Sequence, residues 1–277
     1  MRGAFGAKLA VSCALLQPAP VAADFAPPAE HRSPPSAPSE PGAVAQAYLE
    51  ATQVLEARRL TLAAALQADG LAAPGEAAEL WHQALATQLL PRWVGTPWGG
   101  GATSNARVPR ERGRTVHCGS FVMAVLQGAG LRFLHPELLA QAPALRMLEA
   151  VAPDAIVRLR GDAATMERRL LALGPGVYLL GLSRHIGFAV VTEDAVQLIH
   201  ASEREGQVVS ERAATSKTLR SRSATVFVAQ LTASATSATE HKADRADSDD
   251  RADARLLRQG SAALLGRWLR GAMLGPR

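Results

Sequence analysis

The stretch Thr-Val-His-Cys-Gly-Ser-Phe-Val-Met-Ala-Val-Leu-Gln-Gly-Ala-Gly, residues 115–130, predicts a helix that begins at a cysteine. Its apolar side chains recur at helical spacing, at Phe121, Val122, Val125 and Leu126. Gly128 then ends the helix, and Cys118 falls at or just before its first turn. A helix start offers unpaired N–H groups and the positive end of the helix dipole. Both favour the thiolate, which is the nucleophilic form of cysteine, so Cys118 is the candidate nucleophile.

A nucleophilic cysteine needs a base and a group that orients the base, and two histidines downstream fit these roles. His185 opens an apolar run, residues 185–191, and His200 lies near the end of a second, residues 195–202. Both runs have strand character, and the short polar segment between them, residues 192–194, allows a hairpin. The hairpin would place His185 and His200 close together at one end of a sheet, facing the cysteine helix. This arrangement predicts a Cys-His-polar catalytic triad.

These motifs together resemble the NlpC family of papain-like bacterial cell-wall cysteine peptidases. A Gly-Thr-Pro-Trp-Gly-Gly-Gly stretch, residues 95–101, precedes the Cys-Gly-Ser-Phe-Val helix, and His-Ile-Gly-Phe and Ile-His-Ala-Ser follow on the two strands. The resemblance covers roughly residues 93–231. It implies a papain-like fold in which Cys118 is the nucleophile, His185 the base and His200 the orienting residue. We assign no cofactor to this chemistry.

The chain departs from the family pattern at two points. The usual Asp-Cys-Ser-Gly is His-Cys-Gly-Ser here, residues 117–120, and Trp98 stands in place of the tyrosine after Thr-Pro. We expect a structural role for His117, because a residue adjacent to the nucleophile usually points elsewhere. Trp98 is a candidate for contact with the substrate.

A polar loop between the two motifs, residues 102–116, carries four arginines: Arg107, Arg110, Arg112 and Arg114. One interpretation is a solvated loop. The other is that arginines of this loop bind carboxylates of an acidic ligand. Under the second interpretation, Arg112 and Arg114 are the candidates for substrate binding.

The N-terminus has the pattern of a signal peptide, residues 1–23. Arg2 and Lys8 precede a short apolar run, and Val-Ala-Ala ends the segment before Asp24. We therefore expect an exported protein, periplasmic or extracellular. Cleavage there would remove Cys13, leaving Cys118 as the only cysteine and no disulfide. The alternative, lipid attachment at Cys13, has only a weak preceding motif.

Around the motifs we predict an α+β fold, with the nucleophile helix packed on an antiparallel sheet of about five strands. Residues 24–41 are a proline-rich linker, and residues 42–92 form two helices that pack around the catalytic core. The hydrolase domain, residues 93–231, adds helices before its strands. These helices are expected at Pro136–Gln141, Ala144–Val151 and Ala163–Leu173.

The C-terminal part divides in two. Residues 232–254 are polar, alanine-rich and charged, which is typical of disorder. Residues 255–277 combine leucines and Trp268 with arginines, which predicts a basic amphipathic helix. Such a helix can dock on the body of the protein or contact an anionic membrane surface, and the sequence leaves both open.

Composition and charge narrow the function further. The 277 residues are 48% hydrophobic, which is enough for one sizeable core, and the formal charge of +5 falls to +3 without Arg2 and Lys8. Basic and aromatic residues do not interleave as in single-strand binders, so we predict no nucleic-acid partner.

Three functional alternatives follow from these residues. Cys118, His185 and His200 offer three ligands for zinc, but the short-range ligand pairing of most zinc motifs is absent, and we assign no metal. We predict a cysteine peptidase or amidase that cleaves an amide of peptidoglycan stem peptides through a thioester. The third alternative is a non-catalytic papain-like module that binds cell wall or a partner protein.

Overall fold

The fold is built around an antiparallel sheet of six strands in the order β2-β7-β3-β4-β5-β6. The computed structural model describes residues 40–69, 74–222, 225–234 and 248–275. The strands are β2 (Val157–Leu159), β3 (Gly176–Leu182), β4 (His185–Val191), β5 (Val196–Ser202), β6 (Gln207–Arg212) and β7 (Val226–Ala233). The predicted α+β class is confirmed. The predicted signal peptide and all but the last two residues of the proline-rich linker lie outside the described residues.

The sheet has one strand more than the sequence predicts. The additional strand is β2, which pairs with the edge of β7 over three residues. So short a run carries almost no alternation of apolar and polar residues, and Pro153 just before it indicated only a helix end. A second, two-stranded sheet was also not predicted. It pairs β1 (Arg132–Phe133) with β8 (Met273–Leu274) in parallel.

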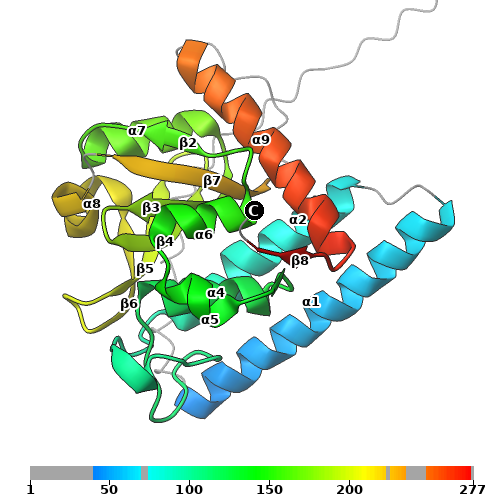
Figure 1. Ribbon diagram of the computed structural model, residues 1–277, viewed down its shortest axis with the longest axis horizontal. Helices are drawn as coiled ribbons and strands as arrows, with labels where there is room; N and C mark the ends of the chain where they lie inside the picture. The colour runs from blue at the N-terminus through cyan, green and yellow to red at the C-terminus, as the bar shows by residue number, and fades with distance from the viewer. Residues whose placement is uncertain (1–39, 70–73, 223–224, 235–247, 276–277) are drawn as a thin grey trace, which may run out of the picture. The chain divides into compact units, whose positions relative to one another are not determined.

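Helices cover both faces of the main sheet (Figure 1). On one face lie α4 (Cys118–Gly128), α5 (Pro136–Gln141) and α6 (Ala144–Val151), and on the other lie α7 (Ala163–Leu173) and α8 (Lys217–Arg222). Successive side chains of a strand enter different cores. Leu179 and Phe188 pack with α4, whereas Tyr178 and Ala189 pack with α7. The predicted bounds of α5, α6 and α7 are confirmed.

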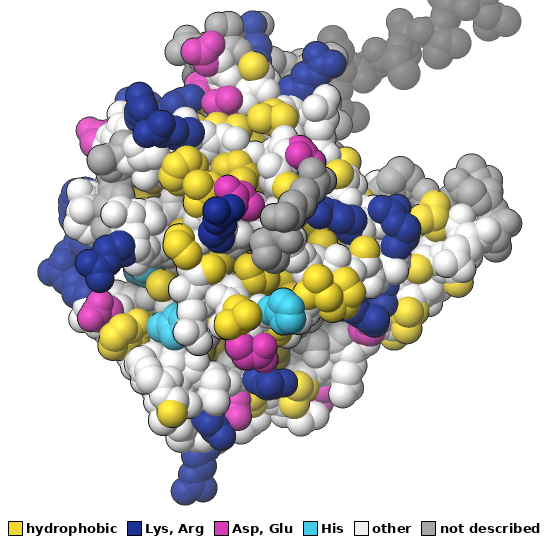
Figure 2. Space-filling view, viewed as in Figure 1, with side chains coloured by type: hydrophobic (Ala, Val, Ile, Leu, Met, Phe, Trp, Pro, Cys, Tyr) yellow, Lys and Arg dark blue, Asp and Glu magenta, His cyan; other side chains and the backbone are white. Residues whose placement is uncertain are grey.

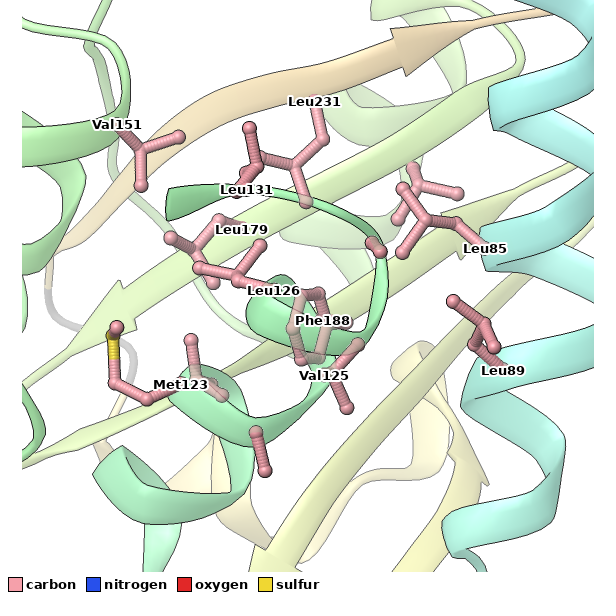
Figure 3. Packing of buried hydrophobic residues seen from close by; sticks show 14 of the residues in the cluster. Leu85, Leu89, Met123, Val125, Leu126, Leu131, Val151, Leu179, Phe188 and Leu231 are labelled. Atoms are coloured by element: carbon pink, nitrogen blue, oxygen red, sulfur yellow. The ribbon is translucent and has the colours of Figure 1, made fainter. Parts of the chain in front are cut away.

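The N-terminal helices pack into the same core as α4. These are α1 (Pro41–Asp69), α2 (Pro74–Gln83), a π-helical segment (Ala84–Leu89) and α3 (Leu90–Trp93). Figure 3 shows Leu85 and Leu89 of the π-helical segment meeting Val125 and Leu126 of α4 and Phe188 of β4. The described part of residues 42–92 therefore packs against α4 and the sheet, as predicted for the N-terminal helices.

Two tryptophans fix the end of the nucleophile helix. Trp81 of α2 and Trp268 of α9 (Ser248–Leu269) stack with their ring centroids 5.2 Å apart. Both indole Nε1 groups donate to the carbonyl of Ala129, at 3.1 and 2.8 Å. The buried guanidinium of Arg59 in α1 donates in turn to the carbonyls of Trp268 and Leu269. The first and the last described helices are thus tied to the C-terminal end of α4.

The C-terminal helix docks on the body of the protein. Its apolar face is buried, through Leu257, Leu264, Leu265, Trp268 and Leu269. These are the side chains that contact with a membrane surface would use. No helix in the described part of the chain is long and apolar enough to cross a membrane.

The predicted disorder of residues 232–254 is wrong at both ends, because β7 continues to Ala233 and α9 begins at Ser248. Asp250 and Asp253 accept hydrogen bonds from Arg169 of α7, at 2.9 and 3.2 Å. Acidic residues in the first turn also suit the positive end of the helix dipole. The sequence alone did not reveal this partner on α7, and residues 235–247 lie outside the described part.

The surface carries no single basic patch on the face that Figure 2 shows. Lys and Arg side chains there are interspersed with acidic, apolar and neutral ones.

Gly119 is required by the close approach of two helices. A Cβ at this position would overlap the carbonyl oxygen of Ala140 in α5. We expect Gly119→Ala to lower the free energy of unfolding by about 2–3 kcal/mol, as overpacking does in rigid surroundings. Urea denaturation measures this, with Gly42→Ala as the control because a Cβ there meets nothing within 4 Å. Equal stability of the two variants would contradict the close approach.

Candidate active site

The nucleophile helix begins with an imidazole cap. His117 Nδ1 accepts from the backbone N–H groups of Gly119 and Ser120, at 3.1 and 3.4 Å. The Ser120 hydroxyl accepts from the His117 N–H at 2.9 Å, which completes a capping box. Cys118 is then the first residue of α4, and it is half-buried. His117 has the predicted structural role, as a helix cap that replaces the usual aspartate or serine, but it does not point away from the site, because it lines the same cleft as Cys118.

The cap makes stability depend on pH. Burial lowers the pKa of His117 below its usual 6.5, and Nδ1 can accept only while it is unprotonated. Below pH 6.5, His117 therefore binds a proton more readily in the unfolded chain than in the folded protein. We expect the contribution of the cap to the free energy of unfolding to be complete above pH 6.5. The contribution should decrease as the pH drops below 6.5, and it should be lost once the pH is below the pKa of His117 in the folded protein.

Urea denaturation at pH 7.5 and 5.5 tests this expectation, with His117→Asn as the matched variant. Asparagine keeps a capping oxygen but does not titrate, so the loss between the two pH values should be smaller in the variant. The comparison is needed because burial also lowers the pKa of His82, which adds a loss of the same sign in both proteins. Identical losses would show that the cap is not the titrating element.

The two predicted histidines lie together, as the hairpin implied. His185 Nε2 and His200 Nδ1 are 3.0 Å apart, and the rings meet edge to face. Phe188 pairs with Ile199, so His200 lies across from Gly187. A Cβ on Gly187 would be 2.8 Å from the Cβ of His200, which shows why the His-Ile-Gly motif has glycine there. Without a side chain at 187, the His200 ring can reach diagonally to His185.

A carboxylate that the sequence analysis missed continues this contact. Glu211 of β6 lies 3.2 Å from His200 Nε2, and it accepts from the hydroxyl of Ser216. The Ser216 hydroxyl oxygen accepts in turn from the backbone N–H of Leu219 in α8. We call His185, His200, Glu211 and Ser216 the polar chain. Finding Glu211 from sequence would have required the register between β5 and β6, which depends on the length of the turn at residues 203–206.

With both imidazoles neutral, the polar chain assigns one tautomer to each ring. A carboxylate accepts only, so His200 Nε2 carries the proton. Neutral His200 then accepts at Nδ1, and His185 must donate from Nε2. This leaves Nδ1 of neutral His185 unprotonated, so it is the basic nitrogen of the pair.

Cys118, His185 and His200 meet at one end of the sheet, as the hairpin predicted, although the two histidines lie on the sheet face opposite α4. Ile186 and Phe188 pack on the α4 side, so the alternation of β4 puts His185 on the side of α7 and α8. His185 is, however, the first residue of its strand and lies at the end of the sheet. A cleft of about 570 Å³ at that end is lined by Cys118, His185 and His200 together.

The other candidates divide between the cleft and its surroundings. Trp98 lines the cleft, as does His117. The backbone N–H of Trp98 donates to the Gly206 carbonyl, which holds the Thr-Pro-Trp segment beside β6. Arg112 and Arg114 are exposed and are not among the lining residues, and Arg114 donates to Asn105 instead. The structure does not bring these two arginines to the nucleophile.

No protein-family model, curated protein or solved structure matches this chain.

The chemistry of the site follows from its own atoms. Among the described residues, no group of three or more His, Cys, Asp or Glu side chains is placed to hold a metal ion. His185 and His200 direct one nitrogen each toward the other rather than toward a common centre. The cleft thus combines a thiol at a helix start with an oriented imidazole, the pairing that nucleophilic catalysis by cysteine uses.

Proposed function

We propose that the protein is an exported cysteine hydrolase, a peptidase or amidase with a papain-like arrangement of Cys118, His185 and His200. One observation carries the proposal. The cleft that holds the thiol of Cys118 also holds His185, whose ring is oriented by the contact of its Nε2 with His200 Nδ1 at 3.0 Å, and His200 is held in turn by Glu211. A histidine with a structural role alone does not need a series of hydrogen bonds such as the polar chain. A catalytic base does, because one defined ring nitrogen must be directed at the proton that it accepts.

In the proposed reaction, His185 Nδ1 takes the proton of Cys118, and the thiolate attacks the carbonyl carbon of an amide. The backbone N–H of Cys118 at the start of α4 helps hold the oxyanion. The C–N bond then breaks, His185 gives its proton to the leaving amine, and a thioester remains. Water hydrolyses the thioester by the same proton transfers. Contacts between catalytic groups often shorten only in the substrate complex, which fits a thiol and a base placed on two sides of one cleft.

The substrate class proposed is the peptide stem of peptidoglycan. Its support is the order of motifs shared with the NlpC family, over roughly residues 93–231, together with the signal-peptide pattern of residues 1–23. The cleft at the sheet end is open to a chain-like substrate, with Trp98 on its wall.

Digestion of purified peptidoglycan by the mature protein tests this function. Mass spectrometry should detect released stem-peptide fragments, and their masses identify the bond that is cleaved. The Cys118→Ala variant is the control for contaminating hydrolases. Binding to peptidoglycan without any released fragment would favour the non-catalytic module instead.

A further inference from the structure

The cleft around Cys118 has an excess of positive charge that the proposed reaction does not use. Three of its lining residues are cations, Arg184, Arg204 and Lys217, and one is a carboxylate, Glu203. Of the carboxylates around the cleft, Glu211 is engaged with His200 and Ser216, and Glu205 lies 3.8 Å from Arg204. The cations come from three separate segments: the β3–β4 turn, the β5–β6 turn and the start of α8. Their convergence on one cavity is a property of the fold rather than of one basic stretch.

Arg184 is held in a conformation that favours glycine. Its φ is +57°, in the left-handed region that side chains other than glycine, asparagine and aspartate rarely adopt. The turn it occupies connects Leu182 to His185, which pair directly across β3 and β4. Two-residue hairpin turns of this kind prefer glycine where φ is positive. An arginine at this position, directly before His185, is a local strain at the edge of the cleft.

Among the described residues, Arg204 and Lys217 have few partners. Arg204 has an exposed ion pair with its neighbour Glu205 at 3.8 Å, and such pairs contribute little. Lys217 is exposed at the first residue of α8, where a cation is disfavoured by the helix dipole. Neither position is explained by the stability of the fold.

We infer that Arg184, Arg204 and Lys217 form a subsite for a carboxylate of the substrate, next to Cys118. Arginine and lysine together bind a carboxylate through charge-assisted hydrogen bonds. The inference rests on the proposed function and narrows it to acidic acyl or peptide substrates. It also moves the carboxylate-binding role from the loop arginines, Arg112 and Arg114, to the sheet end.

Two alkylating reagents of nearly equal size test the subsite without any turnover. Iodoacetate and iodoacetamide both alkylate the thiol with loss of iodide, but only iodoacetate carries a carboxylate. The measured quantity is the ratio of their rate constants on Cys118 of the mature protein, divided by the same ratio for N-acetylcysteine. We expect a value of about five or more at low salt, because a cleft of one charge sign concentrates counter-ions about tenfold or more. The value should fall as salt is added.

Variants locate the effect. The triple change Arg184→Gln, Arg204→Gln and Lys217→Gln should lower the value to within about twofold of one, since three cations are removed. Arg255→Gln on the exposed side of α9 is the control for net charge and should leave the value unchanged. A wild-type value near one would overturn the inference. So would a value that falls in Arg112→Gln with Arg114→Gln but not in the triple variant.

A substrate comparison separates the inference from the proposed function. For a stem peptide that is cleaved, amidation of its free carboxylate should raise KM at least about fivefold in the wild type and little in the triple variant. A raised reagent ratio without cleavage of any peptide would reject the hydrolase and keep the anion subsite. Cleavage with equal KM for both peptides would keep the hydrolase and reject the subsite.

Discussion

Replacing Cys118 with alanine is expected to abolish hydrolysis of stem peptides, by about four orders of magnitude or more in kcat. The reason is that the thioester forms on this sulfur, and no other described cysteine exists to replace it. Binding should be largely retained, because the change removes one atom from a cleft lined by many side chains. The measurement is fragment release from peptidoglycan, with binding followed by sedimentation.

Two controls make this result decisive. Circular dichroism checks that the variant is folded, which is expected because Cys118 is only half-buried and the cap is made by His117 and Ser120. Cys118→Ser keeps the shape of the site but offers a weaker nucleophile, so it should also be inactive or nearly so. Undiminished hydrolysis by folded Cys118→Ala would reject the mechanism.

The second large effect is expected at the base and should decrease along the polar chain. His185→Ala should lower kcat/KM by about 10³-fold, the range of general acid–base catalysis. His200→Ala should cost roughly 10- to 100-fold, because His185 remains but is no longer oriented. Glu211→Ala should cost less than about tenfold, since it acts only through His200. Asparagine or glutamine at 200 should restore part of the rate.

The positions of the protons on the His185 and His200 rings can be measured independently of the hydrolysis rates. At a pH where both histidines are neutral, nitrogen-15 NMR of the wild type should report a proton on His185 Nε2 and none on Nδ1. Glu211→Ala should blur this assignment by freeing His200 to take either tautomer. If Glu211→Ala lowered kcat/KM as much as His185→Ala does, the polar chain would serve folding rather than catalysis.

The parts of the site that sequence predicts are those fixed by local pattern. The helix bounds of Cys118–Gly128 follow from apolar periodicity and terminal glycines, and the contact of His185 with His200 follows from a short hairpin. The face on which the histidines lie does not, because it depends on which side of β4 the nucleophile helix packs.

The parts that sequence misses are those fixed by register and by contacts between distant elements. Glu211 meets His200 only because β5 and β6 pair as they do, and Asp250 orders the start of α9 only through Arg169. Arg112 and Arg114 illustrate the opposite error. They lie close to Cys118 in sequence, yet the loop directs Arg114 to Asn105 and leaves both outside the cleft. The cations that do line it come from turns that carried no motif.

The paired tryptophans at the end of α4 have a consequence for the order of folding. The carbonyl of Ala129 takes one donor from Trp81 and one from Trp268, 139 residues further along the chain. During synthesis, the nucleophile helix and the whole sheet therefore leave the ribosome before the segment that completes their anchorage. Contacts of such long sequence separation form late and slow the search for the native state. The start of α4, where Cys118 lies, thus reaches its final setting only after almost the entire chain is available.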